Sequence, residues 1–179
     1  MKILTSSLLL ILMISSTQKI DFGNGKDGQS WQVVNDGVMG GRSQGSKMLT
    51  ENSMVFWGEV SLENNGGFSS LRSNFSNKQL SQFEKVSLRY RSKGISLAMT
   101  FSVSNRWYVP NYKFSLASTG GEWSMITINL NQFRKHYIGK PMDEMLDQEV
   151  LKKVIRMGFI TDEKKYGSFE FEVDYIEFV

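Results

Sequence analysis

The stretch ISLAMTFSV, residues 95–103, decides the fold class of this chain. Every second residue is apolar, and the five that alternate in this way are Ile95, Leu97, Met99, Phe101 and Val103. In an extended chain successive side chains point to opposite faces, so this period of two predicts a half-buried β-strand. The preceding KVSLRY, residues 85–90, alternates in the same way, and its apolar face carries Val86, Leu88 and Tyr90.

Further strands are predicted on both sides of this pair, at residues 54–62, 68–75, 112–116, 123–130, 154–161 and 168–179. The last one changes register at Tyr175 and Ile176, as a β-bulge allows. Turns rich in Gly and Asn, such as ENNGG at 63–67 and STGGE at 118–122, separate these strands. Such a series of short strands predicts an all-β chain, folded as an antiparallel β-sandwich.

One short helix is also expected, directly after Pro141. The apolar residues that follow keep an approximate period of 3.6, and they are Met142, Met145, Leu146, Val150 and Val154. Proline is favourable in the first turn of a helix. We also expect Asp143 and Glu144 to lie at the start of this helix, where acidic side chains interact favourably with its dipole.

Composition narrows the function classes. The chain has 179 residues, a formal net charge of +3 and no cysteine. This length suits one domain with a full core. Basic and acidic residues alternate without a basic block, so no nucleic-acid partner is expected. The lack of cysteine excludes disulfides, thiolate zinc sites and cysteine nucleophiles.

The N-terminus differs from the rest of the chain. In MKILTSSLLLILMISSTQ, Lys2 precedes an apolar run that ends in small polar residues. This order predicts a signal peptide at residues 1–18, followed by one β-sandwich domain at residues 19–179. The run is shorter than the roughly 20 apolar residues of a membrane-spanning helix. We therefore expect an exported protein, periplasmic or secreted, with no transmembrane segment after signal removal; a buried N-terminal strand is the alternative.

The segment NDGVMGGRS, residues 35–43, holds three glycines but matches no nucleotide-binding motif. It lacks the G-x-G-x-x-G spacing of dinucleotide sites and the Gly-Lys-Ser/Thr end of a phosphate loop. We expect a loop in which Gly37, Gly40 and Gly41 adopt positive φ or allow close backbone approach. Asp36 is expected to pair with Arg42 and to accept backbone N–H groups.

Taken together, several segments make the chain resemble the complex I intermediate-associated protein 30 family. They are Trp31, NDGVMGGRS (35–43), FWGEVSL (56–62), NNGGFSSLR (64–72), GGEW (120–123), NQF (131–133), IRMGFI (155–160) and GSF (167–169). The resemblance covers roughly residues 20–179. It implies a galactose-binding-like jelly roll, similar to carbohydrate-binding modules of family 11. It also implies a chaperone-like role in assembling respiratory complex I (NADH:ubiquinone oxidoreductase). This role is best known for members that act in the mitochondrial matrix, and an export signal does not fit it.

Catalytic chemistry is not expected. The single histidine, His136, lies in a basic segment without a partner nucleophile, and Asp143 and Glu144 are assigned to the helix start. No residues in the sequence have the spacing of a cofactor-binding motif or of a set of catalytic metal ligands, so neither a cofactor nor a catalytic metal is expected. DFGNGKDG, residues 21–28, has oxygen ligands for a structural calcium ion but lacks the spacing of an EF-hand loop, and a plain turn is the alternative.

Binding is the function that the sequence supports. Trp107 and Tyr108 stand beside Arg and Asn residues in a loop, which suits sugar stacking or a protein contact; the alternative is that one of them covers the end of the core. Asp36, Arg42 and Arg72 come from the two glycine-containing motifs, and both arginines are expected on one loop surface. We therefore expect a non-catalytic binding protein of the assembly-factor type, acting on a protein complex that is membrane-associated or periplasmic; the alternative is an exported carbohydrate-binding module.

Overall fold

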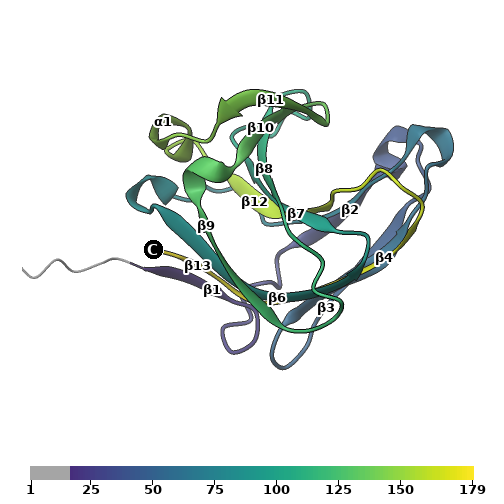
Figure 1. The fold of residues 1–179 in the computed structure, drawn as a ribbon, viewed down its shortest axis with the longest axis horizontal. Helices are drawn as coiled ribbons and strands as arrows, with labels where there is room; N and C mark the ends of the chain where they lie inside the picture. The colour runs from purple at the N-terminus through teal and green to yellow at the C-terminus, as the bar shows by residue number, and fades with distance from the viewer. Residues whose placement is uncertain (1–16) are drawn as a thin grey trace, which may run out of the picture.

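Residues 17–179 are described by a computed structural model, in which two antiparallel sheets pack face to face (Figure 1). This confirms the predicted all-β sandwich. Nearly all of the predicted signal peptide falls on residues 1–16, which lie outside the described residues.

The first sheet has six strands, in the order β3-β4-β13-β6-β9, and β1 also pairs with β13. Their bounds are β1 Gln18–Asp21, β3 Gln44–Leu49, β4 Met54–Val60, β6 Lys85–Gly94, β9 Ser124–Asn129 and β13 Gly167–Phe178. The long strand β13, which the alternating pattern predicts as a strand, lies at the centre of this sheet. Its register against β6 shifts between Val173 and Tyr175, close to the predicted bulge.

The second sheet has seven strands, in the order β11-β10-β8-β7-β12-β5-β2, and Figure 1 shows it running from the β10–β11 hairpin to β2. Their bounds are β2 Gln32–Asn35, β5 Ser69–Arg72, β7 Leu97–Ser102, β8 Asn111–Ser115, β10 Arg134–Tyr137, β11 Lys140–Met145 and β12 Arg156–Thr161. Short 3-10 turns and one helical turn join the strands: η1 Asp36–Met39, η2 Glu63–Asn65, η3 Leu80–Gln82, η4 Leu130–Gln132 and α1 Gln148–Leu151.

The core lies between the two sheets and is rich in aromatic rings. Phe159 of β12 meets Phe171 of β13 with ring centroids 4.6 Å apart, which joins the centres of the two sheets. Trp31 also stacks on Phe159, with ring centroids 6.2 Å apart. The residues of the opening stretch behave as predicted: Ile95, Leu97, Met99 and Phe101 are buried and Val103 packs against the core. Burial of these apolar faces is the main force that holds the sheets together.

The predicted helix after Pro141 is wrong over most of its length. Residues 140–145 form β11 at the edge of the second sheet, and only one helical turn, α1, follows. Strand β11 pairs with β10 across a hairpin whose turn residues Ile138 and Gly139 have positive φ. Pro141 is tolerated there because an edge strand has one side without ladder hydrogen bonds.

Charges also favour this strand over a helix. Asp143 and Glu144 form ion pairs with Arg134 and Lys135 of the neighbouring strand at 3.2 and 3.0 Å, so they do not start a helix. The N-terminus of α1 is capped instead by Asp147, whose carboxylate accepts the Val150 N–H at 2.8 Å.

Candidate functional site

Asp36 joins the two glycine-containing segments. This side chain is 1% exposed, and its carboxylate accepts hydrogen bonds from residues on both sides of the junction. Ser43 donates from its backbone N–H at 2.9 Å and from Oγ at 2.5 Å. From the second segment, the N–H groups of Gly67 and Phe68 donate at 2.6 and 3.2 Å. A single buried carboxylate therefore fixes the positions of the segments 35–43 and 64–72 relative to each other.

The pKa of Asp36 reflects these contacts. Burial alone raises the pKa of the carboxyl, but the hydrogen bonds from Ser43, Gly67 and Phe68 favour the charged form more strongly. The net pKa lies below the ordinary value, so Asp36 is ionised at neutral pH.

The predicted pair between Asp36 and Arg42 is wrong. Arg42 extends outward from the loop and forms an ion pair with Glu63 of η2 at 2.9 Å. Both side chains are more than 60% exposed, so this pair contributes little to stability. Asp36 needs no cation because four hydrogen bonds already stabilise its charge. Sequence reasoning missed Glu63 as the partner because the two loops are distant in sequence and adjacent only in the fold.

The three glycines of the first segment differ in backbone conformation and in the space around them. Gly40 has φ of 88°, the left-handed conformation that closes η1. Gly41 lies against Asp36: a Cβ there would stand 2.4 Å from the carboxyl carbon. Gly37 has open space around it and no positive φ, so neither predicted reason applies to it.

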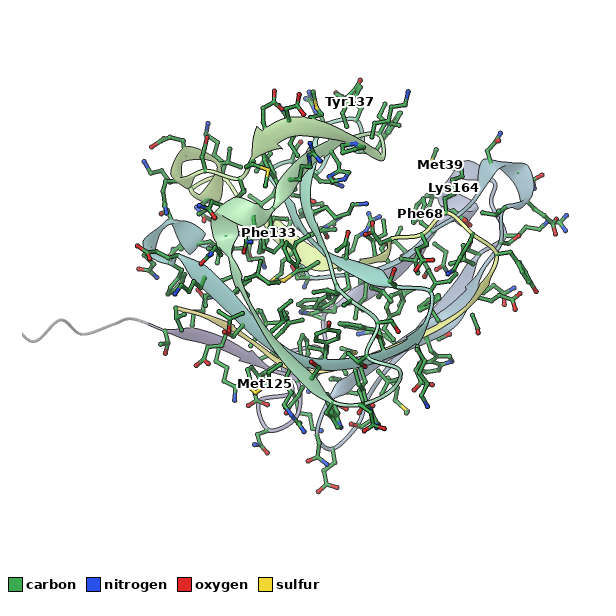
Figure 2. The ribbon with its side chains drawn as sticks, in the orientation of Figure 1. Met39, Phe68, Met125, Phe133, Tyr137 and Lys164 are labelled. Carbon is green, nitrogen blue, oxygen red and sulfur yellow. The ribbon has the colours of Figure 1, made fainter. Side chains whose placement is uncertain are left out.

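An apolar loop patch, formed by Val38, Met39 and Leu62, lies on the solvent side of this junction. Val38 is 75% exposed, Met39 68% and Leu62 43%. The loops that carry them are tied together by the Arg42–Glu63 ion pair and by the Asn64 side chain, which donates to the Gly40 carbonyl at 3.0 Å. Figure 2 shows Met39 at the same end of the molecule as Phe68 and Lys164.

Val38 and Met39 are the apolar residues of the first segment that lie in this patch. Between the buried anchor Asp36 and the glycines, Val38 and Met39 have no alternation that would assign them to a strand. That lack of periodicity is the sequence signal that indicates their exposure.

Trp107 and Tyr108 lie in the loop between β7 and β8. They are 75% and 46% exposed, so neither covers the end of the core, and that alternative is wrong. Their rings meet edge to face with centroids 5.9 Å apart, and Arg106 donates to the Tyr108 hydroxyl at 3.2 Å. Trp107 is the more exposed of the two, and an exposed indole suits stacking on a sugar or on a partner side chain.

Arg72 lies on the outer face of the seven-stranded sheet, away from the core. Its neighbour Leu71 is fully buried between the sheets, so Arg72 must point to the opposite face. Strand register aligns one row across this face: Arg134, Lys113, Thr100, Gly158, Arg72 and Gln32. Arg72 donates from Nε to Ser70 Oγ at 2.8 Å, whereas Arg42 pairs with Glu63. The two motif segments thus lie together, but their arginines have no partner in common.

His136 and the 21–28 segment make local contacts. His136 Nδ1 lies 2.9 Å from the Arg134 carbonyl oxygen, and burial lowers the pKa of the ring. In the 21–28 segment, the Asp21 carboxylate accepts the N–H groups of Gly23 and Asn24, as in a plain turn. Within residues 17–179, no group of three or more His, Cys, Asp or Glu side chains is arranged to hold a metal ion. None of the helices in that range has the length and apolar character needed to cross a membrane.

Comparison with known proteins identifies the family. A family model described as complex I intermediate-associated protein 30 matches residues 20–173. No curated protein matches the sequence significantly.

Among solved structures, the fold is similar to that of a family 11 carbohydrate-binding module from a cellulosomal cellulase of Clostridium thermocellum. The TM-score is 0.67 at 17% identity, over 92% of this chain and 96% of the module. A family 11 module from the same organism, in complex with a β-1,3-1,4-mixed-linked tetrasaccharide, gives a TM-score of 0.64 at 18% identity, over 91% and 95% of the two chains. At these identities the similarity establishes the shared fold.

Proposed function

Because the chain belongs to the complex I intermediate-associated protein 30 family, we propose that it is a non-catalytic binding protein that holds a protein partner during the assembly of a larger complex. The observation that carries this proposal is the apolar loop patch on the family segments. Val38 and Met39 are more than two-thirds exposed, although burying such side chains would be favourable by roughly 1.5–3 kcal/mol each.

The patch is also pre-organised for binding. Asp36 fixes the loop from below with four hydrogen bonds, and the Arg42–Glu63 pair borders the apolar side chains with charge. An apolar centre within a polar rim is the usual composition of a protein–protein contact. A rigid loop loses little conformational entropy on binding, which favours affinity. We propose that this partner is the membrane-associated or periplasmic protein complex expected from the sequence.

Loss of the patch tests this function. The double variant Val38→Ser, Met39→Ser should fold normally but lose co-purification of its partner from solubilised host membranes and soluble extract. Met125→Ser is the matched control, because Met125 is 67% exposed on β9 of the six-stranded sheet, outside the patch. Equal recovery of the same partner with the loop variant and the control would contradict the proposal.

Carbohydrate binding is the second candidate, and the exposed Trp107–Tyr108 pair favours it. The sugar-bound module named above has the same fold, and aromatic faces beside polar side chains suit sugar rings. Trp107→Ala should leave the unfolding midpoint unchanged and abolish retardation of the protein in gels containing mixed-linkage β-glucan. Unretarded migration of the wild-type protein across glucan and other neutral polysaccharides would exclude this candidate.

A further inference from the structure

Two arginines lie diagonally across neighbouring strands on the outer face of the seven-stranded sheet. Arg72 of β5 is paired with Gly158 of β12, and Arg156 stands two residues before that glycine on the same face. Diagonal neighbours of this kind lie within reach of long side chains. Gly158 has no side chain to separate the two guanidinium groups, and both arginines are half-buried.

Neither guanidinium has an anionic partner. No carboxylate among residues 17–179 lies within 4 Å of Arg72 or Arg156, although nine other cations of that range form ion pairs. Arg72 donates to Ser70. The Arg156 guanidinium carbon stands 3.4 Å from the centre of the Phe75 ring, while its Nε is buried without a hydrogen-bond partner. Leaving a buried donor unpaired is unfavourable.

The electrostatics of the arginine pair also indicate positive charge that is not neutralised. Burial and the nearby charge of Arg156 lower the pKa of Arg72 to about 10, so it still carries its charge at neutral pH. Burial and Arg156 also lower the pKa of Lys78, whose ammonium donates to the Asn74 carbonyl and to Ser76 Oγ. Three cations therefore gather at a place where nothing in the described chain neutralises them. Arg72 Nε is already bound to Ser70 and Arg156 Nε is buried, so an oxyanion would be bound by the terminal Nη groups of the two planar guanidinium groups.

The surroundings indicate what carries the oxyanion. The outer face around the two arginines carries hydroxyl and amide groups from Thr100, Ser102, Gln32 and Asn111. Val34 and Ile160 lie on the same face in the row beyond Arg72, whereas the end of the sheet beside Arg156 is polar and suits a ligand rich in hydroxyl groups. Residue 102 pairs with both Arg156 and Asn111, so the site lies at the end of the sheet where the Trp107 loop begins.

We propose that Arg72 and Arg156 bind the carboxylate of an acidic saccharide, a uronate, on this outer face. The saccharide part of this proposal rests on the carbohydrate candidate above, whereas the anion site rests on the two arginines. Phe75 holds the Arg156 guanidinium in place, and the hydroxyl groups of the sheet bind the sugar ring.

Calorimetric titration with oligogalacturonate at low salt tests the site, and the fully methyl-esterified oligomer is the matched neutral ligand. The wild-type protein should bind the acid at least tenfold more tightly than the ester. Arg72→Met and Arg156→Met should each weaken acid binding at least tenfold, and Arg156→Lys should lose part of it. Lys85→Met, which removes an exposed cation from β6 of the other sheet, should bind as the wild type does.

Thermal unfolding separates binding from folding. Without ligand, both Met variants should melt at or above the wild-type temperature, because each removes one of two like charges. Equal affinity for acid and ester would overturn the anion site and leave carbohydrate binding standing. Failure of both oligomers to bind would overturn the saccharide assignment and weaken the carbohydrate candidate. Binding of poly-glutamate, but not oligogalacturonate, in an Arg72-dependent manner would assign the site to an acidic polypeptide and contradict the proposal.

Discussion

Replacing Asp36 by alanine should be among the most destabilising single changes in the loops of this protein. The substitution leaves three backbone N–H groups, those of Ser43, Gly67 and Phe68, without their acceptor. A buried donor without a partner costs about 1–3 kcal/mol. Gly67 and Phe68 are only partly buried and will recover some hydrogen bonding to water, so we expect a total loss of about 3–5 kcal/mol.

Equilibrium unfolding in urea, followed by tryptophan fluorescence, measures this loss as a change in midpoint at constant slope. Asp143→Ala is the matched control, because its carboxylate is fully exposed and should leave the midpoint unchanged. A loss below about 1 kcal/mol for Asp36→Ala would refute the role of this carboxylate as the anchor of the two segments.

The same anchor predicts a dependence on pH. The pKa of Asp36 is lower in the folded protein than its ordinary value, so the unfolded chain binds the proton more readily. The stability that Asp36 provides is therefore present above pH of about 4, the ordinary pKa, and is lost as the pH falls through the folded value. Asp36→Asn should show a shallower loss of stability with acid than the wild type does. Identical acid profiles would contradict the assigned pKa shift.

Two further predictions concern the same loop. Arg42→Ala should change the free energy of unfolding by less than about 1 kcal/mol, and its effect should add to that of Asp36→Ala within about 0.5 kcal/mol, since the two side chains do not pair; strong coupling in a double-mutant cycle would restore the rejected pair. Gly41→Ala should destabilise the protein because its Cβ would clash with the Asp36 carboxyl. Gly40→Ala should cost about 1 kcal/mol through its positive φ, and Gly37→Ala should leave stability unchanged. Urea midpoints that show Gly37→Ala destabilised, or Gly41→Ala unchanged, would refute the loop geometry.

The sheets could be predicted from sequence because their signal is local. Alternation in residues 95–103 needs no knowledge of neighbouring strands, and the buried residues follow it. Strand β11 could not be read in this way, because its approximate helical period is overridden by pairing with β10. The short polar strand β3 was missed for a similar reason: only its pairing with β4 makes it a strand.

The candidate site divides along the same line. Gly40, Gly41 and Asp36 could be assigned to a structural loop because their chemistry is restrictive wherever they occur, whereas the assignment of Gly37 has no support in the structure. The partners of Asp36 in the second segment lie more than 30 residues away, and the Arg42–Glu63 pair depends on how two loops meet. Nothing in the sequence indicates that Arg156 belongs to a site. The neighbours of a residue on the outer face of a strand, and whether any of them is acidic, depend on strand pairing that the sequence does not reveal.

The most direct test of the central claim is site-specific photo-crosslinking in the native host. A benzophenone amino acid placed at Met39 lies in the apolar loop patch, and the same group at Met125 lies at an equally exposed position on β9 of the six-stranded sheet. If the patch holds a protein partner, the Met39 probe should give one discrete adduct, identifiable by mass spectrometry, that the Met125 probe does not give. An absence of any adduct at Met39, or the same adducts from both positions, would contradict the claim.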